Sequence, residues 1–540
     1  MGQLGLTYWT QHFPVGSTWL MPSVGGVEDR IIFSVFKGIL FPVLSFCYTF
    51  YFNKWGVECN LTLFLFIFSA VYLLCENRVT FLKIKIILAW IGGGFFVTFV
   101  GRYFFHIQPS AVWSLAIIAE PTFYKLFFSV LGLYLYWIYF NGLNTFFSKI
   151  IFEQLILVLC ILIFGSLLIT CNHFIDFFIV LTGLSLCLYV LIAQPKHLFA
   201  IEAATKYYGL GLASVALTLF GILLLYAEYG SLLFSDICWT GNIVSKTNQR
   251  FGSGLEVSGL VLLLVGIFFK LSAFPAFLWA ADVYEGSSLF VVGILLISKL
   301  AVFGVLANVL FIFSSLQGFV WAPLLFLSGV GSLFVGTFGA ILQQKLRRFL
   351  AFSSINHLGF VLLGAAFEIG PCILAASYLV VYILATIVLF VVVLRIRRRN
   401  GSNVVYITEL HHSLPKLPLL SAVFVASVFS LAGIPPFIGF FTKYAIFLQC
   451  FITNTLGGSA AFFVCLFLLA FSAFNYLRLL KATFFRLGPV KMQLFRTWDA
   501  GVWHEWRVTV WTVFVLLSGT FLWRYLFVAI HFSTSFLPFC

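Results

Sequence analysis

Long uninterrupted apolar runs constrain the fold of this chain more than any other feature. A helix of about 20 apolar residues spans the hydrocarbon core of a bilayer, whereas a membrane β-strand alternates apolar and polar positions. The runs in this chain are continuous, so they predict membrane-spanning helices. About fifteen runs of helix length lie at 31–52, 60–75, 84–105, 123–143, 150–171, 174–193, 207–227, 257–280, 287–311, 321–342, 351–366, 371–394, 417–448, 457–480 and 509–530.

The composition agrees with a lipid environment for these helices. The 540-residue chain is 62% hydrophobic and 9% charged, whereas an ordinary soluble domain has about 25% charged residues. Its mean hydropathy is +1.09. These values exclude a cytosolic enzyme, a secreted disulfide-rich protein and a disordered chain. They predict an all-α polytopic membrane protein with about 14–15 transmembrane helices.

The distribution of basic residues predicts the orientation of the chain in the membrane. The net charge is +14, which in a soluble protein would indicate nucleic-acid binding. From residue 144 onward, however, one set of alternate loops carries 16 Lys and Arg, and the other set carries 2, Lys246 and Arg250. Loops rich in Lys and Arg face the cytoplasm or the mitochondrial matrix. The charge therefore reflects topology, and we expect no nucleic-acid partner.

The sequence contains no motif for a metal, cluster or nucleotide. The eleven cysteines form no CxxC pair, and most of them lie inside apolar runs. No GxGxxG or Walker loop is present. We therefore interpret the cysteines as small buried hydrophobes and expect neither a metal site nor a nucleotide site.

Two of the apolar runs contain prolines that should break their helices. Residues 257–280 contain Pro275, and residues 417–448 contain Pro435 and Pro436. Proline lacks an N–H and clashes with the carbonyl four residues earlier. In a membrane such a break is tolerated only where protein or a watery cavity satisfies the freed backbone groups.

The two broken runs also resemble each other in sequence. FKLSAFPAF at 269–277 and FSLAGIPPF at 429–437 agree at four of nine positions. The second copy comes five spans after the first, and an odd step inverts the orientation. Inverted repeats with broken helices are typical of transporters whose ion path lies at the breaks. The pattern predicts two inverted repeats.

Three lysines lie well inside apolar runs and are candidates for the chemistry. They are Lys270, Lys299 and Lys443. A charge at the bilayer centre costs about 2.5–3.5 kcal/mol on insertion scales, so each lysine should face the bundle interior, water or an acid. Desolvation lowers the pKa of a lysine and a nearby acid raises it, which suits a proton relay. Snorkelling or a structural ion pair is the alternative interpretation.

His357 and four charged residues at helix ends allow two interpretations each. His357 lies just inside the run at 351–366 and is either a relay member or a structural histidine bonded to a carbonyl. Glu202, Lys206, Asp282 and Glu285 are expected to be solvated or to cap helices.

Five segments that contain these residues resemble the subunit 2 family of respiratory complex I. This family consists of antiporter-like subunits of NADH:quinone oxidoreductase. The segments occur in the order and spacing of that family, and with the span pattern they cover about 150–480 of the chain. They are IEAATKYYGLG (201–211), FFKLSAFPAFLWAADVYEG (268–286), LLISKLAVFG (295–304), LRRFLAFSSINHLGF (346–360) and SLAGIPPFIGFFTKYAIF (430–447).

The resemblance implies a domain organisation built on two inverted five-helix repeats. The family has fourteen helices in its full-length form. Its two repeats agree with the repeats that the prolines predict. The expected parts are divergent N-terminal transmembrane helices (1–149), the first antiporter-like repeat (150–280), a linking helix with Lys299 (281–320), the second repeat (321–480), and a basic loop with a C-terminal transmembrane helix (481–540).

The resemblance also implies proton translocation coupled to electron transfer on other subunits. The proton-transfer lysines of the family match Lys270, Lys299 and Lys443, and its histidine matches His357. No cofactor is implied on this subunit, because NADH, FMN, iron–sulfur clusters and ubiquinone belong to other subunits. The expected partners are antiporter-like subunit 4, the small subunit 4L, accessory subunits and lipids. The 69 phenylalanines favour the mitochondrial inner membrane over a bacterial plasma membrane.

The sequence departs from the family in the helix expected at 174–193. The family usually has a glutamate there, paired with the lysine that matches Lys270, but this chain has Thr182. The nearest acid on that helix, Asp176, is six residues away, which is about 9 Å along the axis and about 240° around it. Glu153, on the preceding helix, is the other possible acidic partner.

Two further departures from the family concern the first half-channel, and two alternative functions remain open for the chain as a whole. The family usually has His where Phe277 stands and Pro where Ala281 stands, so the first half-channel is expected to be modified or inactive. One alternative is a subunit of a multisubunit cation/proton antiporter, which the DVYEG segment at 282–286 disfavours. The other is a structural complex I subunit that has lost translocation.

Overall fold

A computed structural model describes most of the chain between residues 148 and 497. The predicted runs before residue 144, the run at 509–530, and Pro436 lie outside the described residues. The described residues are 148–169, 171–195, 197–238, 254–313, 321–367, 372–397, 404–414, 418–435, 437–452, 456–485 and 496–497.

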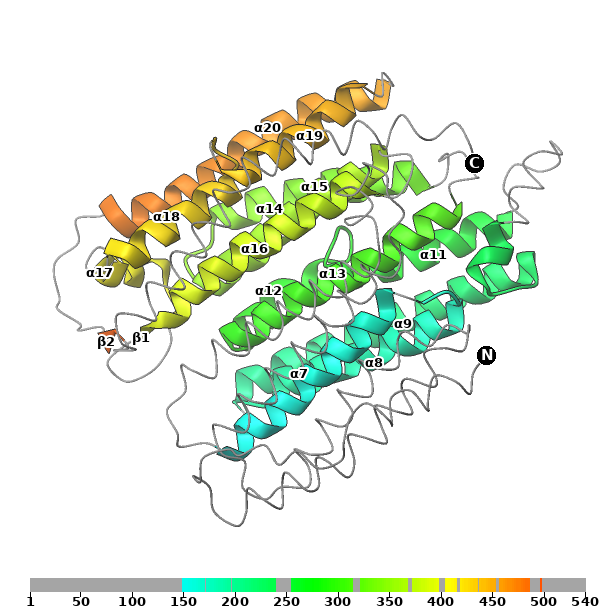
Figure 1. Cartoon of the computed structure of the whole chain (residues 1–540), viewed down its shortest axis with the longest axis horizontal. Helices are drawn as coiled ribbons and strands as arrows, with labels where there is room; N and C mark the ends of the chain where they lie inside the picture. The colour runs from blue at the N-terminus through cyan, green and yellow to red at the C-terminus, as the bar shows by residue number, and fades with distance from the viewer. Residues whose placement is uncertain are drawn as a thin grey trace, which may run out of the picture. The chain divides into compact units, whose positions relative to one another are not determined.

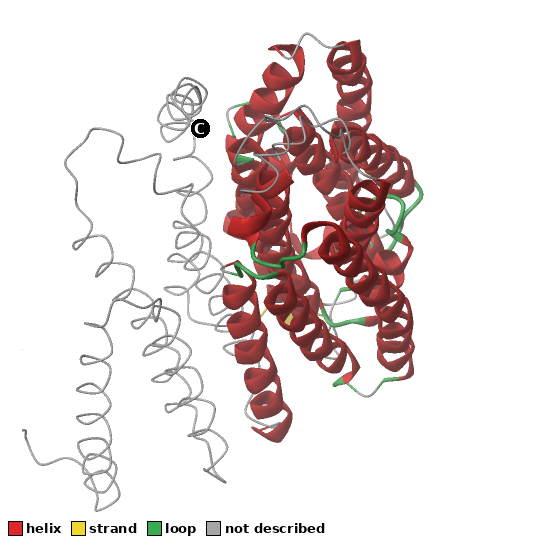
Figure 2. Ribbon diagram, turned by 90° about the vertical axis from the view of Figure 1, so that its right-hand side faces the viewer, coloured by secondary structure: helices red, strands yellow, loops and turns green. Residues whose placement is uncertain are grey.

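The described part is helical almost throughout, as Figure 2 shows. Eight of its helices are long and apolar enough to cross a membrane, and three shorter apolar helices accompany them. This confirms the prediction of an all-α polytopic membrane protein. The helices are α7 Ser148–Ile169, α8 Phe174–Ala193, α9 Leu198–Tyr229, α11 Gly254–Leu271, α12 Leu278–Gly286, α13 Leu289–Ile312, α14 Trp321–Ile341, α15 Leu346–Phe367, α16 Ile373–Arg395, α17 Leu410–Ser413, α18 Pro418–Ala432, α19 Ile438–Ile452 and α20 Leu456–Leu480.

Short elements complete the described part at one end of the bundle. Strands β1 (Ile396–Arg397) and β2 (Arg496–Thr497) pair antiparallel. A 3-10 turn at Ile407–Glu409 precedes α17, and a π-helical turn at Lys481–Phe485 follows α20. All of these elements belong to the loops that the charge count assigns to the basic side.

Helix α13 lies at the centre of the described bundle. The helices run side by side with their axes nearly parallel, and α13 contacts α7, α8 and α11 as well as α16 (Figure 1). Nearly all of its residues are buried, and Lys299 lies near the middle of the helix. A helix that is apolar all round belongs in the interior of a bundle, so α13 places its lysine away from lipid.

The first break separates α11 from α12 and satisfies its own backbone. The N–H of Ser272 bonds to the carbonyl of Phe269 at 3.0 Å, and the N–H of Ala273 bonds to that of Phe268 at 2.9 Å. This pair of bonds is a Schellman motif, with Ser272 in the left-handed region at φ 60°. The indole N–H of Trp279 also donates to the Phe269 carbonyl at 3.0 Å. The freed carbonyls therefore find partners inside the protein.

The second break, between α18 and α19, repeats this motif. The N–H of Gly433 bonds to the carbonyl of Ser430 at 3.2 Å, and that of Ile434 bonds to Phe429 at 3.1 Å. Gly433 adopts φ 81°, which glycine reaches without a steric penalty. Both breaks therefore use the same backbone device in the two segments that the sequence pairs.

The breaks in the described part occur where the prolines predict them. Pro275 and Pro435 lie in the non-helical links that follow α11 and α18. The residues after the first link form a separate helix that continues to Gly286. Residue 280 therefore lies inside α12, and the division into repeats stays a prediction.

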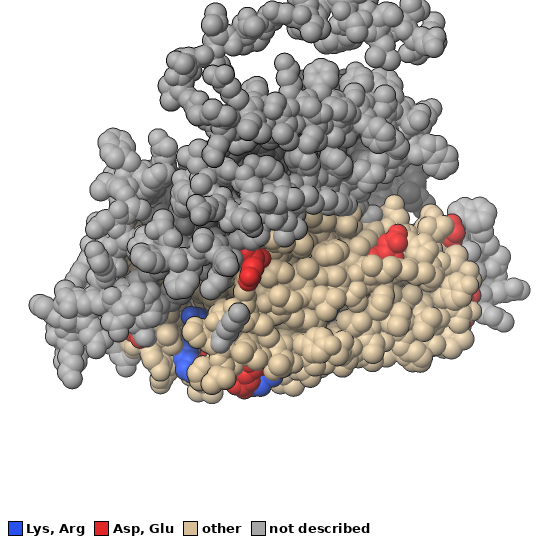
Figure 3. Space-filling model, turned by 90° about the horizontal axis from the view of Figure 1, so that it is seen from below, with Lys and Arg blue, Asp and Glu red and all other residues tan. Residues whose placement is uncertain are grey.

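The outer surface of the described part is apolar, as a lipid-facing surface requires. The side of the molecule drawn in Figure 3 is uncharged over most of its described area, with only scattered acidic and basic groups. Large exposed hydrophobic side chains lie on α8, α9 and α20, and among them are Ile179, Phe220 and Phe467. In lipid this exposure carries no hydrophobic penalty.

Candidate functional site

Lys270 lies in the last turn of α11 and meets a phenol rather than an acid. Its side chain is 5% exposed. The ammonium donates to the hydroxyl of Tyr189 on α8 at 3.3 Å. It also lies 5.6 Å from the ring of Tyr189 and 5.9 Å from that of Phe269, distances that allow cation–π attraction. Among the described residues, no carboxylate forms an ion pair with this lysine.

The residues considered as acidic partners of Lys270 lie elsewhere. Thr182 is half-buried, and its hydroxyl donates to the carbonyl of Ile179 on its own helix at 2.8 Å. Asp176 is exposed in the first turn of α8, where the helix dipole favours a carboxylate. Glu153 is exposed and accepts a 3.4 Å hydrogen bond from the side chain of Gln194. The proposed pairing of Lys270 with Glu153 or Asp176 is therefore not seen in this structure.

Tyr189 contacts the lysine in the absence of the family glutamate. It follows Thr182 by seven residues on α8, which places both residues on the same face of the helix, about two turns apart. A neutral phenol can accept a hydrogen bond from the lysine and can donate one in turn. Lys270 therefore has a neutral partner, whereas the resemblance implies an ionic one.

Lys299 donates hydrogen bonds to two serine hydroxyls. Its side chain is 2% exposed. The ammonium donates to Ser272 Oγ at 2.8 Å and to Ser354 Oγ at 3.3 Å. It also lies 5.6 Å from the ring of Tyr284 on α12. Ser272 belongs to the first break and Ser354 to α15, so this lysine joins the two halves of the described bundle.

His357 is clamped on both ring nitrogens by tyrosines. It is 1% exposed. Nδ1 lies 2.6 Å from the hydroxyl of Tyr378 on α16, and Nε2 lies 2.7 Å from that of Tyr476 on α20. The ring of Tyr382 stacks on the imidazole at 4.4 Å. The backbone-bonded alternative for His357 is therefore replaced by a hydroxyl on each nitrogen.

Lys443 rests on the carbonyl end of a broken helix. It is 3% exposed. The ammonium donates to the carbonyls of Leu431 and Ala432 at 2.8 and 3.0 Å, and it lies 5.3 Å from the ring of Phe360. These carbonyls end α18, where the helix dipole is negative and favours a cation. Pro435 therefore exposes the carbonyls that hold this lysine.

Helix α15 connects the three central groups. Ser354, His357 and Phe360 follow one another at three-residue intervals, which places them along one face of the helix. Ser354 contacts Lys299, and Phe360 contacts Lys443, with His357 between them. Lys299, His357 and Lys443 can each gain or lose a proton. Ser354 can pass one through its hydroxyl, whereas Phe360 only contacts the ammonium of Lys443.

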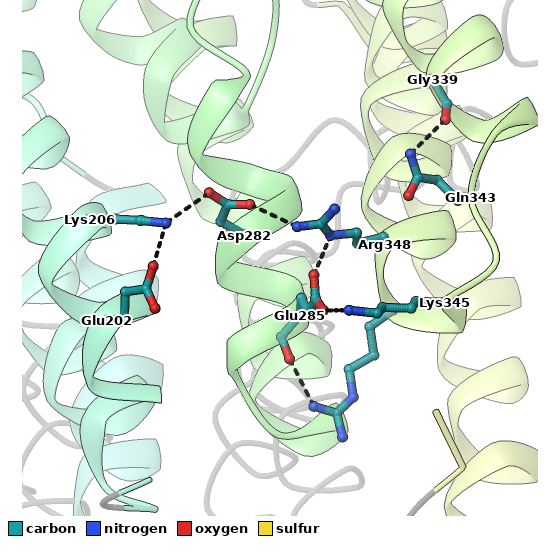
Figure 4. A network of polar contacts seen from close by, with 9 residues as sticks. Glu202, Lys206, Asp282, Glu285, Gly339, Gln343, Lys345 and Arg348 are labelled. Carbon is teal, nitrogen blue, oxygen red and sulfur yellow. Dashed lines mark hydrogen bonds and ion pairs between the residues drawn. The ribbon is translucent and has the colours of Figure 1, made fainter. Parts of the chain in front are cut away.

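A separate network of charged side chains joins α9, α12 and the start of α15, and Figure 4 shows it. Its members are Glu202, Lys206, Asp282, Glu285, Lys345 and Arg348. Lys206 lies 2.7 Å from Glu202 and 3.3 Å from Asp282, which in turn lies 3.4 Å from Arg348. Glu285 pairs with both Lys345 and Arg348. The side chains of Glu202, Lys206, Asp282 and Glu285 stay partly exposed. Besides the pair of Glu202 with Lys206 on α9, the network pairs Lys206, Asp282 and Glu285 across helices.

The hydroxyl partners of the lysines and the histidine were not predicted from the sequence. Tyr189, Tyr378 and Tyr476 each bond one of these groups. A usable signal existed, because the chain prefers phenylalanine, with 69 Phe and 21 Tyr. A tyrosine inside an apolar run carries a hydroxyl that needs a partner.

No cluster of three or more His, Cys, Asp or Glu side chains that could hold a metal ion occurs among the described residues. The candidate site is therefore the row of lysines, histidine, serines and tyrosines itself.

The fold and this row define a class: polytopic membrane proteins with broken helices and buried ionisable groups, which in membranes mark ion pathways. Residues 171–470 match the family described as NADH:quinone oxidoreductase/Mrp antiporter, TM. This match covers more than half of the chain, and the chain belongs to that family.

Relatives and a solved structure support the family assignment. NADH-quinone oxidoreductase subunit N 1 of Rhizobium meliloti (strain 1021) is 33% identical over 328 residues, which are 59% of this chain and 65% of the relative. NADH-ubiquinone oxidoreductase chain 2 of Marchantia polymorpha is 31% identical over 347 residues, 62% of this chain and 67% of the relative. The chain thus spans just under two thirds of the first relative.

A chain in the structure of respiratory complex I from Thermus thermophilus with bound aureothin shares the fold. It aligns with a TM-score of 0.67 and 27% identity, covering 85% of this chain and 97% of that chain.

Proposed function

We propose that this chain is a proton-translocating membrane-arm subunit of NADH:quinone oxidoreductase, respiratory complex I. The observation that carries the proposal is the row of Lys270, Lys299, His357 and Lys443, buried and hydrogen-bonded to neutral partners. The relatives named as subunits N and chain 2 support the assignment to that complex. The two broken helices support the division into repeats at 150–280 and 321–480.

Neutral partners make the proton occupancy of each lysine responsive to its surroundings. A buried ammonium without a carboxylate is costly, and a like charge nearby adds repulsion. A change in hydration or in a neighbouring charge therefore loads or releases a proton. We infer that a proton enters from the basic side, passes Lys299 and His357 along α15, and leaves near Lys443.

Hydroxyl groups lie beside two of the groups on this proposed path, Lys299 and His357. Ser354 donates to the carbonyl of Ala351 at 2.8 Å while accepting from Lys299. Tyr378 and Tyr476 each contact one nitrogen of His357. A hydroxyl can accept a proton on one side and release one on the other, so it can relay without a net charge.

The electron-transfer chemistry is placed on other subunits. In this proposal NADH, FMN, iron–sulfur clusters and the quinone are bound elsewhere, and this chain contributes no redox step. Its proposed neighbours are antiporter-like subunit 4, the small subunit 4L, accessory subunits and lipids. We propose the mitochondrial inner membrane as its location, with a bacterial plasma membrane as the alternative.

A native gel of detergent-solubilised membranes tests the assignment. Lanes are stained for NADH dehydrogenase activity and analysed by mass spectrometry for peptides of this chain. We expect the peptides to peak in the large NADH-active band. Peptides confined to a smaller band without NADH activity would contradict the complex I assignment.

The family description also names Mrp antiporters, so a cation/proton antiporter is the second candidate. The DVYEG segment at 282–286, which ends α12 and carries the ion pairs of Asp282 and Glu285, disfavours it. Sodium-dependent proton flux in vesicles that lack NADH would favour the antiporter.

A purely structural role is the third candidate, because Thr182 stands where the family has glutamate. It predicts that replacing Lys270 by Ala leaves proton pumping intact in the assembled complex. We expect instead a clear pumping defect, since Lys270 remains buried and hydrogen-bonded to Tyr189. The ratio of protons moved to NADH oxidised separates the two outcomes.

A further inference from the structure

A cavity of about 730 Å³ opens at the basic end of the bundle. It lies between the link from α14 to α15, the 3-10 turn at 407–409, and the end of α20. Its volume falls in the range of small-molecule sites. Its polar lining includes Gln343, Gln344, Thr408, Asn475, Arg478 and Lys481. No carboxylate lines it within the described part of the chain.

The two basic side chains of this cavity have donors to spare. Arg478 uses one guanidinium N–H to donate to the carbonyl of Gln343 at 3.0 Å. A guanidinium has five N–H donors, so the others remain available. Lys481 is exposed and makes no ion pair or hydrogen bond with any described residue. This excess of donors and positive charge favours an anion.

The side-chain oxygen of the buried Asn475 can accept a hydrogen bond from a donor in the cavity. This side chain is 3% exposed, and its amide N–H donates to the carbonyl of Thr337 at 2.8 Å. Its oxygen has no partner among the described residues. A buried polar atom without a partner is rare, and it indicates a ligand or water in the cavity.

An apolar stripe on α20 leads from the membrane to the cavity. Phe463, Phe467, Phe474 and Leu477 are exposed, and their spacing places them on the face that ends at Lys481. Figure 1 shows α20 at the outer edge of the described bundle. A lipid tail can therefore lie along this stripe while its headgroup meets Arg478 and Lys481.

We propose that this cavity binds the headgroup of an anionic phospholipid from the basic leaflet. The phosphate would accept from Arg478 and Lys481, and a hydroxyl or ammonium of the headgroup would donate to Asn475. The acyl chains would cover the exposed stripe of α20. The occupant is a lipid rather than free phosphate, because the stripe and the cavity are continuous and basic residues at this boundary attract anionic lipids.

Photo-cross-linking in the intact complex tests this site. Membranes receive a photoreactive phosphatidylglycerol, and cross-linked peptides are located by mass spectrometry. We expect labels on the segments around Thr408 and at residues 474–485. A photoreactive phosphatidylcholine with the same chains should label these segments several-fold less. Equal labelling by both lipids would overturn the requirement for an anionic headgroup.

Two matched pairs of variants sharpen the test. Thr408→Asp places a negative charge in the cavity, whereas Thr205→Asp places the same charge at an exposed position of α9 outside it. Only the first should reduce labelling several-fold. Arg478→Gln with Lys481→Gln should also reduce it, while Arg478→Lys with Lys481→Arg should preserve it. Native gels confirm that each variant assembles before labelling is compared.

Inorganic phosphate distinguishes a lipid site from a free-phosphate site. We expect millimolar phosphate to leave the labelling unchanged beyond the effect of an equal ionic strength of chloride. Displacement of the lipid by phosphate alone would overturn the lipid assignment. Unchanged labelling in the two Gln variants would overturn the proposed site.

Discussion

The chemistry at the residue scale depends on neutral partners for charged groups. Lys270, Lys299 and Lys443 donate to a phenol, to serine hydroxyls and to backbone carbonyls, respectively. None of these partners fixes a charge on the lysine as a carboxylate does. In the proposed relay, these neutral partners would leave the protons of the buried row exchangeable.

The hydroxyl of Ser272 should matter for the function of Lys299. A hydrogen bond to a charged group contributes about 1.5–3 kcal/mol, so both Ser272→Ala and Ser272→Gly should lower proton pumping several-fold. At φ 60°, glycine removes the steric strain of the left-handed backbone, whereas alanine keeps this strain. Equal defects in the two variants, measured as protons per NADH in assembled complex, would identify the hydroxyl as the cause. A defect confined to alanine would identify backbone strain instead.

Tyr189 should act as the partner of Lys270 in place of the missing glutamate. Tyr189→Phe removes the hydroxyl that accepts from the lysine and keeps the ring. We expect reduced pumping at normal assembly, assayed with inside-out vesicles. The exposed Tyr226 on α9 supplies the control, and Tyr226→Phe should pump normally. Normal pumping in both variants would show that the hydroxyl of Tyr189 is not needed for the function of Lys270.

At the scale of elements, close packing at the helix breaks holds the lysines in place. Lys443 depends on the end of α18, against which the start of α19 packs. A Cβ added at Gly439 would lie 1.9 Å from the carbonyl oxygen of Ser430. This contact leaves no room for a side chain, so the geometry around Lys443 requires glycine at this position.

Gly439→Ala should therefore destabilise the second break. Overpacking of this kind costs about 1–3 kcal/mol, and we expect less assembled complex and a lower melting temperature on native gels. Gly209→Ala is the control, because a Cβ at Gly209 meets nothing within 4 Å. A normal yield of the Gly439 variant would show that the two helices separate more easily than their packing indicates.

The ion-pair network couples elements that the sequence separates widely. Asp282 bridges α9 and the start of α15, whereas Glu202 pairs with Lys206 on its own helix. Exposed ion pairs are individually weak, but Asp282 takes part in two pairs that join two helices, whereas Glu202 takes part in one. Asp282→Asn should therefore lower the melting temperature of the complex more than Glu202→Gln. Equal effects in thermal denaturation would indicate that the bridge between helices is unimportant.

At the scale of the whole molecule, the sequence predicts the helical class and the two breaks. Apolar runs and prolines are local signals, so α11, α18 and the links near Pro275 and Pro435 could be predicted. The burial of the lysines followed from the cost of a charge in lipid.

The partners of these groups could not be predicted in the same way. Tyr476 bonds His357 across 119 residues, and Ser354 bonds Lys299 across 55. Such contacts depend on how the helices pack, which no local pattern encodes. Ser272 itself adopts the left-handed conformation at the end of α11. A serine in the sequence does not predict that conformation, so its contact with Lys299 could not be predicted either.

The central claim is that the buried row moves protons, and Lys299 tests it most directly. The measurement is the number of protons translocated per NADH oxidised in vesicles containing the intact complex with Lys299→Met. Leu300→Met, one residue along α13, controls for packing. The account predicts a lower ratio for Lys299→Met in assembled complex and a normal ratio for Leu300→Met. A normal ratio for Lys299→Met would contradict it.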